Sequence, residues 1–96
     1  YGTNFDKGIF GYGYTTYSMT NLVSNVGVVA TDTTGVGTGR QFLAATQYGG
    51  DKGIFGYGLS GSVTAITNLV SNVGVVSTDV TGVGTGRSGT MSCSYN

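Results

Sequence analysis

Residues 7–14 alternate large apolar and small side chains with the period of a β-strand. Phe10, Tyr12 and Tyr14 would lie on one face, and Ile9, Gly11 and Gly13 on the other. A second copy repeats the arrangement, with Phe55, Tyr57 and Leu59 opposite Ile54, Gly56 and Gly58. The pattern predicts two strands, each with an aromatic face and a nearly bare face that a neighbouring sheet can approach closely.

The segment after each of these strands predicts further short strands and tight turns. Two β-branched runs, residues 21–24 and 28–31, flank a turn at 24–27, and residues 68–78 repeat this arrangement. Residues 41–46 form another strand candidate before a glycine turn at 48–51. Because no segment has sustained helical periodicity, the expected fold class is all-β.

The chain is nearly the same sequence written twice. Residues 20–40 and 67–87 differ only at Ala30/Ser77 and Thr33/Val80, and DKGIFGYG stands at both 6–13 and 51–58. Tyr1, Tyr48 and Tyr95 mark a period of 47 residues. We therefore expect two tandem repeats, 1–47 and 48–96, the second with a degenerate C-terminal end. Such units complete one another's core by stacking, so we expect open edges and self-association.

Composition limits both the core and the partners. Of 96 residues, 19 are glycine and 39% are hydrophobic, which predicts a small core. Four basic and four acidic residues give zero net charge, which argues against nucleic-acid binding. The uncharged stretches 8–31 and 53–78 are interrupted by glycine and polar residues, so no membrane span is expected. The start at Tyr1 suggests a processed product or a piece of a longer repeat protein.

The chain lacks the usual equipment of catalysis. With no histidine and one cysteine, Cys93, neither a nucleophile–histidine pair nor the usual zinc site can be built. The four carboxylates, at positions 6, 32, 51 and 79, recur at equivalent repeat positions, which favours roles in turns. The glycine-rich residues 35–40 lack the lysine and the following helix of a phosphate-binding loop. We expect no enzyme activity, cofactor or metal.

The eight charges occupy repeat-equivalent positions and suggest an assembly role. Asp32 precedes Arg40 by eight residues, and Asp79 precedes Arg87 by the same interval. We predict that each Asp–Arg pair forms locally, so that identical units stack without accumulating charge. The aromatic residues Phe10, Tyr12, Tyr14, Phe55 and Tyr57 are the predicted stacking positions.

The repeat resembles a kelch-type repeat of phage and environmental bacterial proteins. The residues that carry the resemblance are Arg40, Leu43–Ala44–Ala45, Tyr48–Gly49–Gly50 and the strand KGIFGYG at 52–58. The resemblance implies blades of a β-propeller, with an outer strand pair at 68–79. The chain departs from that family in lacking tryptophan, in its altered sequence after Arg87, and in having two units where a closed propeller has four to eight.

Two functions remain open at this point. The first is a structural protein that assembles into a β-rich filament, amyloid-like or an extracellular fibre, because long uncharged segments without proline suit stacked strands. The alternative is a kelch-like module of two blades that completes an oligomeric propeller for ligand binding or adhesion, with loops at 15–20 and 60–67. Either places the protein outside the cell or on a virion. The seven tyrosines could also stack on carbohydrate, although a packing role is the more ordinary use.

Overall fold

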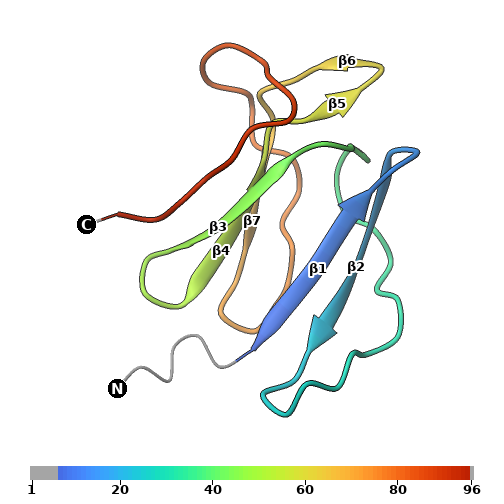
Figure 1. Cartoon of the computed structure of the whole chain (residues 1–96), viewed down its shortest axis with the longest axis vertical. Helices are drawn as coiled ribbons and strands as arrows, with labels where there is room; N and C mark the ends of the chain where they lie inside the picture. Colours follow the sequence, from blue (N-terminus) through green and yellow to red (C-terminus); the bar gives the residue numbers. More distant parts are fainter. Residues whose placement is uncertain (1–6, 96) are drawn as a thin grey trace.

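The computed structural model describes residues 7–95 and contains seven strands in three antiparallel sheets, which confirms the all-β class (Figure 1). The strands are β1 (Gly8–Gly13), β2 (Tyr17–Val23), β3 (Ala44–Tyr48), β4 (Lys52–Gly56), β5 (Leu59–Ser60), β6 (Ser62–Val63) and β7 (Thr67–Val70). Within the described residues, no helix is long and apolar enough to cross a membrane.

The first sheet is the hairpin of β1 and β2. Its first strand, β1, is the one that the alternation of residues 7–14 predicted. Gly8 pairs with Val23, and Phe10 with Asn21. The register becomes irregular between Gly11 and Gly13. Residues 17–20, expected in a loop, belong to β2.

The second sheet has the order β3-β4-β7 and repeats the pairing of the first. Gly53 pairs with Val70, and Phe55 with Asn68, as their counterparts do in β1 and β2. The additional strand β3 pairs with the other edge of β4. The predicted turn at 48–51 is confirmed, with left-handed glycines at 49 and 50. Because β3 joins the second sheet, the packed units divide near Arg40, ahead of the boundary of the sequence period.

A return segment follows the last strand of each sheet. It turns at Gly27 (φ 83°) and Gly74 (φ 84°), as the sequence predicted. The hydroxyl oxygens of Ser24 and Ser71 accept hydrogen bonds from two main-chain amides in each turn. After the turn, residues 28–31 form no continuous strand. Isolated bridges tie this part of the chain to β2 instead, and equivalent bridges tie the later copy to β7.

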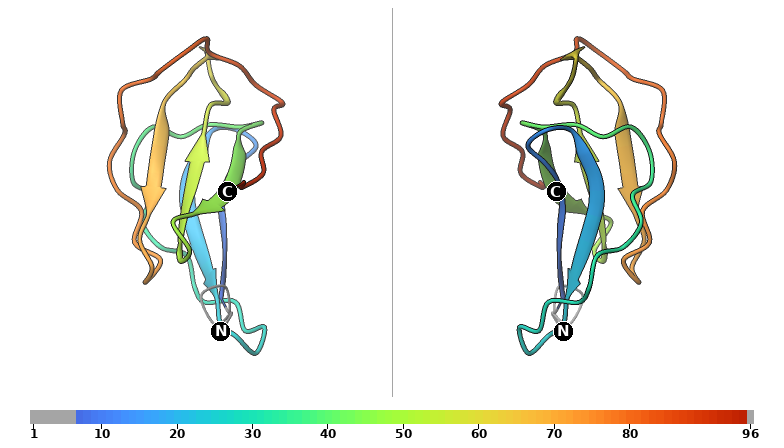
Figure 2. Two further views of the ribbon diagram at one scale, coloured as in Figure 1. Left: turned by 90° about the vertical axis from the view of Figure 1, so that its left-hand side faces the viewer. Right: turned by 90° about the vertical axis from the view of Figure 1, so that its right-hand side faces the viewer.

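The two larger sheets pack face to face, as the edge-on view of Figure 1 and the side views of Figure 2 show. We call residues 7–40 the first unit, 41–87 the second unit, and 88–95 the C-terminal segment. The core between the units is small. It consists of Tyr12, Phe55, Val70 and Val76, with partly buried Ile9, Val36 and Leu43 around them.

The structure corrects the predicted aromatic face. Phe10 is 64% exposed on one side of β1, whereas Tyr12 packs on the opposite side, against the second unit. Tyr12 and Tyr57 both have φ near 65°, a left-handed conformation that ends the strand alternation. Each tyrosine therefore lies on the glycine face, opposite the phenylalanine that precedes it.

Candidate functional site

The contact between the two units is the most developed site in the molecule. Phe55, only 4% exposed, lies directly over Gly11, where an added Cβ would come within 2.7 Å of the phenyl ring. The ring of Tyr12 packs beside Phe55 with a centroid separation of 5.0 Å and a tilt of 55°. The close approach predicted for the glycine face is thus confirmed at Gly11, since only a residue without a side chain leaves room for Phe55.

Arg40 closes this contact from the edge, and its side chain is fully buried. Its guanidinium lies 4.8 Å from the centre of the Tyr12 ring. One terminal guanidinium nitrogen donates to the carbonyl oxygens of Tyr57 (3.3 Å) and Ile66 (2.6 Å) in the second unit, and the other terminal nitrogen donates to the side-chain oxygen of Asn68. A cation at the end of the first unit therefore holds three acceptors of the second unit.

A polar cluster in the second unit receives this end of the first. The Asn68 amide donates to the carboxylate of Asp79 (2.9 Å) and to the carbonyl oxygen of Ser77 (3.2 Å). Thr38 of the first unit donates to the same carboxylate through its main-chain N–H (3.0 Å) and its hydroxyl (2.6 Å). The hydrogen bonds from Thr38, with smaller help from Asn68 and Arg40, lower the pKa of Asp79.

Whereas hydrogen bonds lower the pKa of Asp79, burial raises the pKa of Tyr12. The pKa of the Tyr12 hydroxyl is raised because the ring is removed from water, although Arg40 opposes the shift. The hydroxyl donates to the carbonyl oxygen of Val36 (3.1 Å), so it is satisfied as a neutral group. The site is thus a neutral aromatic contact closed by one buried cation and one carboxylate.

The predicted local ion pairs are not formed. The Arg40 guanidinium meets acceptors of the second unit, whereas Asp32 accepts a hydrogen bond from Asn21 (2.8 Å). Asp79 contacts Thr38 and Asn68, and the Arg87 guanidinium lies over Tyr57 instead. Among residues 7–95 the ion pair is that of Lys52 with Asp51, at 3.0 Å. The physical reason is that each guanidinium lies over a tyrosine ring, Arg40 over Tyr12 and Arg87 over Tyr57. The Arg40 guanidinium also reaches carbonyl oxygens of the second unit, which an aspartate eight residues earlier does not replace.

The outer face of the second unit carries the same arginine and tyrosine, without a third unit against them. The Arg87 guanidinium lies 4.5 Å from the centre of the Tyr57 ring, and the Tyr57 hydroxyl donates to Val83 as Tyr12 does to Val36. Arg87 is exposed, whereas Arg40 is buried.

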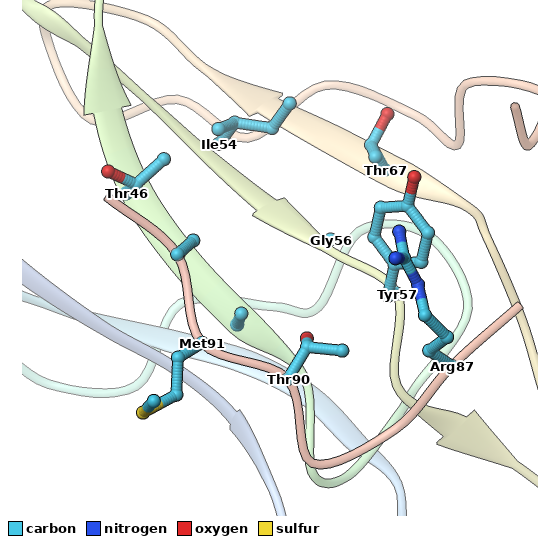
Figure 3. Close-up of a pocket in the computed structure, with 10 residues that line it drawn as sticks. Thr46, Ile54, Gly56, Tyr57, Thr67, Arg87, Thr90 and Met91 are labelled. Atoms are coloured by element: carbon cyan, nitrogen blue, oxygen red, sulfur yellow. The ribbon is translucent and has the colours of Figure 1, made fainter. Parts of the chain in front are cut away.

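These residues border a cavity of about 450 Å³. Figure 3 shows Arg87 against Tyr57 on one side and the C-terminal segment, with Thr90 and Met91, on the other. Gly56 and Thr67 contribute to the walls. They are the counterparts of Gly11, over which Phe55 lies in the internal contact, and of Thr20 beside it.

The outer face of the first unit carries the complementary half. Asn21 and Asp32 form the same pair as Asn68 and Asp79. The Asn21 amide donates to Asp32 and to the carbonyl oxygen of Ala30, as the Asn68 amide donates to Asp79 and to that of Ser77. Phe10 lies on this face, 64% exposed, where its counterpart Phe55 is buried. Each end of the molecule therefore presents one half of the contact that joins its two units.

Sequence reasoning found the arginines, aspartates and aromatics but assigned no role to Asn68 or Thr38. Their signal was repetition, because Asn21 and Thr85 recur one period away in the same sequence context. Of the five predicted stacking residues, Tyr12 and Phe55 pack between the units, whereas Phe10 and the Tyr57 ring lie on the outer faces. Tyr14 is in neither place. Its ring meets that of Phe42 edge to face, at 6.3 Å.

The described residues contain no group of three or more His, Cys, Asp or Glu that could hold a metal ion. No protein-family model matches the chain, and no curated protein or solved structure is significantly similar to it.

Proposed function

We propose that this chain is a structural protein that self-associates head to tail, using between copies the contact that joins its own two units. One observation carries the proposal. The outer face of the first unit presents Phe10 with Asn21 and Asp32, and the outer face of the second unit presents the cavity with Arg87. The internal contact is a template in which equivalent groups fit together.

The apolar half of this contact is a phenylalanine entering a glycine-floored cavity. Phe10 of the next copy would lie over Gly56 of the preceding one, beside Tyr57, as Phe55 lies over Gly11 beside Tyr12. Burying one phenylalanine side chain contributes about 1.5–3 kcal/mol. Because association also loses translational and rotational freedom, this contact alone would give weak, concentration-dependent assembly.

The polar half supplies direction. Arg87 of one copy would enter the pair of Asn21 and Asp32 of the next, as Arg40 enters that of Asn68 and Asp79. Two different surfaces meet in such a contact, so it is heterologous, and it continues until the rotation between copies closes a ring or a filament forms.

We favour a filament, serving as an extracellular fibre, as the form of this assembly. Addition through sheet faces supports it in preference to an amyloid-like ladder, in which identical strand edges pair every ~4.8 Å. The second candidate is a ring, the kelch-like oligomeric propeller with a ligand-binding or adhesive role. One observation favours it: Ser92 donates to the carbonyl oxygen of Ala45, so residues one period apart lie side by side, as the inner strands of neighbouring blades do.

The test measures mass against concentration by multi-angle light scattering. The unaltered chain should grow from monomer to oligomer as concentration rises, and Phe10→Ser should remain monomeric while staying folded. Val26→Ser is the control, because Val26 is an exposed apolar residue (79%) of the first unit and its counterpart Val73 stays 72% exposed where the two units meet. Equal assembly of both variants, or a monomer at every concentration, would overturn the proposal.

Electron microscopy of the assembled sample then separates the two forms. A ring gives one discrete mass that stops growing, whereas a filament gives masses that increase with concentration. Fibre diffraction adds the third outcome, since a strong axial reflection near ~4.8 Å would indicate an edge-paired ladder and overturn addition through faces.

A further inference from the structure

We propose that residues 91–95 of one copy add as an antiparallel strand to the open edge of β1 in the next copy. The proposal rests on head-to-tail association and names the chain segment that completes it. The contact would then combine side-chain packing with a main-chain ladder.

Two equivalent strands, β1 and β4, have unequal numbers of partners. β4 pairs with β7 on one edge and with β3 on the other. β1 is the counterpart of β4 in sequence and register, yet within residues 7–95 it pairs with β2 alone. Among residues 7–95, no strand pairs with the edge of β1 that corresponds to the β3 edge of β4, and such an edge accepts a further strand.

The C-terminal segment has the same position in the repeat as β3. β3 begins four residues after Arg40, and residue 91 stands four residues after Arg87. Tyr95 stands one full period after Tyr48, the last residue of β3. Residues 91–95 are therefore the counterpart of β3, although their sequence, MSCSY against AATQY, retains only the tyrosine.

The C-terminal segment also lies where a following copy would meet it. The chain leaves the end of the second unit as it leaves the end of the first. The main chain of Arg87 donates to Thr64 and accepts from Gly58, as the main chain of Arg40 donates to Tyr17 and accepts from Gly13. The segment then runs along the side of the three-stranded sheet that faces away from β1 and β2, seen in red in Figure 1.

Two hydrogen bonds fix its spacing from β3. The main-chain N–H of Gly89 donates to Phe42, and the Ser92 hydroxyl donates to Ala45, both at 2.7 Å. Each bond joins residues exactly one sequence period apart. The segment therefore lies beside β3, at the place that β3 itself would take in a following unit. It borders the cavity that Phe10 of the next copy would enter. Met91 is 95% exposed and Tyr95 is 94% exposed.

The pairing of β3 with β4 gives the register of the new ladder. Thr46 pairs with Ile54 and Gln47 with Gly53, so Cys93 would lie opposite Ile9 of the next copy and Ser94 opposite Gly8. Directly opposed residues in an antiparallel pair have Cα atoms about 4.5–5.5 Å apart, a separation that a disulfide can bridge. Cross-linking can therefore report the register.

The experiment oxidises assembled protein with oxidised glutathione and resolves it on a non-reducing gel. Ile9→Cys should cross-link to the native Cys93 of another copy, giving a ladder of dimers and higher species that a reductant removes. Gly8→Cys, displaced by one residue and facing the other side of the strand, is the matched control and should cross-link at least tenfold less. Because Ile9 packs against the core, a second pair leaves it in place: Gly8→Cys with Ser94→Cys, in a Cys93→Ser background.

The outcomes separate this proposal from the one it rests on. Association by light scattering with equal cross-linking of Ile9→Cys and Gly8→Cys, and none in the second pair, would overturn strand addition while leaving head-to-tail assembly intact. A chain that stays monomeric at every concentration would overturn both. Preferential cross-linking in both in-register pairs supports the strand.

Discussion

Arg40 is a fully buried cation whose bonds go to main-chain carbonyl oxygens and an amide rather than directly to a carboxylate. Asp79 is reached through Asn68, which donates to the aspartate and accepts from the arginine. Such a group is stabilised only while all its partners remain, because an unpaired buried polar group is destabilising. The repeat supplies a natural comparison, since Arg87 has the same sequence context but is exposed.

We expect Arg40→Met and Arg87→Met to have different effects. Removing the buried guanidinium leaves acceptors of the second unit without donors and should lower the free energy of unfolding by about 3 kcal/mol. Removing Arg87 loses one cation–π contact at the surface, which is worth about 0.5–1 kcal/mol. Urea denaturation of the two variants, at concentrations where the protein is monomeric, measures the difference. Equal losses would contradict the template role assigned to Arg40.

Asp79 predicts a specific sensitivity to acid. Its folded-state pKa is lowered, chiefly by Thr38, so the unfolded chain binds the proton more readily. The stability that this carboxylate contributes is therefore complete above its unfolded pKa of about 3.9 and is lost as the pH falls further, through the lowered folded value. The unfolding free energy of Asp79→Asn, measured from pH 6 to pH 2, should fall less steeply than that of the unaltered chain. An identical slope below pH 4 would exclude the effect.

At the scale of elements, the two hairpins present one glycine face each, and only one of them is covered. Gly11 and Gly56 are equivalent, and an added Cβ at either would lie 3.1 Å from a threonine methyl of the neighbouring strand. They differ in what stands over them. Phe55 covers Gly11, while the cavity lies over Gly56. The same substitution therefore tests folding in one place and association in the other.

Gly11→Ala should destabilise the fold, because its methyl group would come within 2.7 Å of Phe55 and force the units apart. Overpacking of this kind costs about 1–3 kcal/mol. Gly56→Ala should cost less in a thermal melt of the monomer but should weaken self-association, since Phe10 of the next copy would meet the same methyl. A Gly56→Ala variant that assembles as well as the unaltered chain would contradict the proposed docking of Phe10.

The elements also show how far sequence alone reaches. Alternation and turn chemistry predicted β1, β4 and the glycine turns, because these depend on neighbouring residues. The face of Tyr12 was missed because a left-handed residue interrupts the alternation, and no composition rule marks that position for a tyrosine. The partner of Arg40 was also missed, because it depends on which unit packs against the arginine rather than on its distance along the chain.

At the scale of the whole molecule, the two outer faces differ from one another. One carries Phe10 with Asn21 and Asp32, and the other carries the cavity with Arg87. An interface between unlike surfaces needs one intact face from each partner, whereas a two-fold symmetric interface needs the same face from both. The distinction can be tested by mixing two variants, each with one damaged face.

Phe10→Ser damages the first face and leaves the cavity, while Arg87→Glu damages the second face and leaves Phe10. Arg87→Glu also brings a carboxylate to the Asp32 of the next copy, which adds like-charge repulsion. Each variant alone should be monomeric in sedimentation velocity. Mixed in equal amounts, they should form a dimer and nothing larger, because the intact cavity of one receives the intact Phe10 of the other and both remaining faces are damaged. A mixture that stays monomeric, or that grows beyond the dimer, would rule out head-to-tail addition through these two faces.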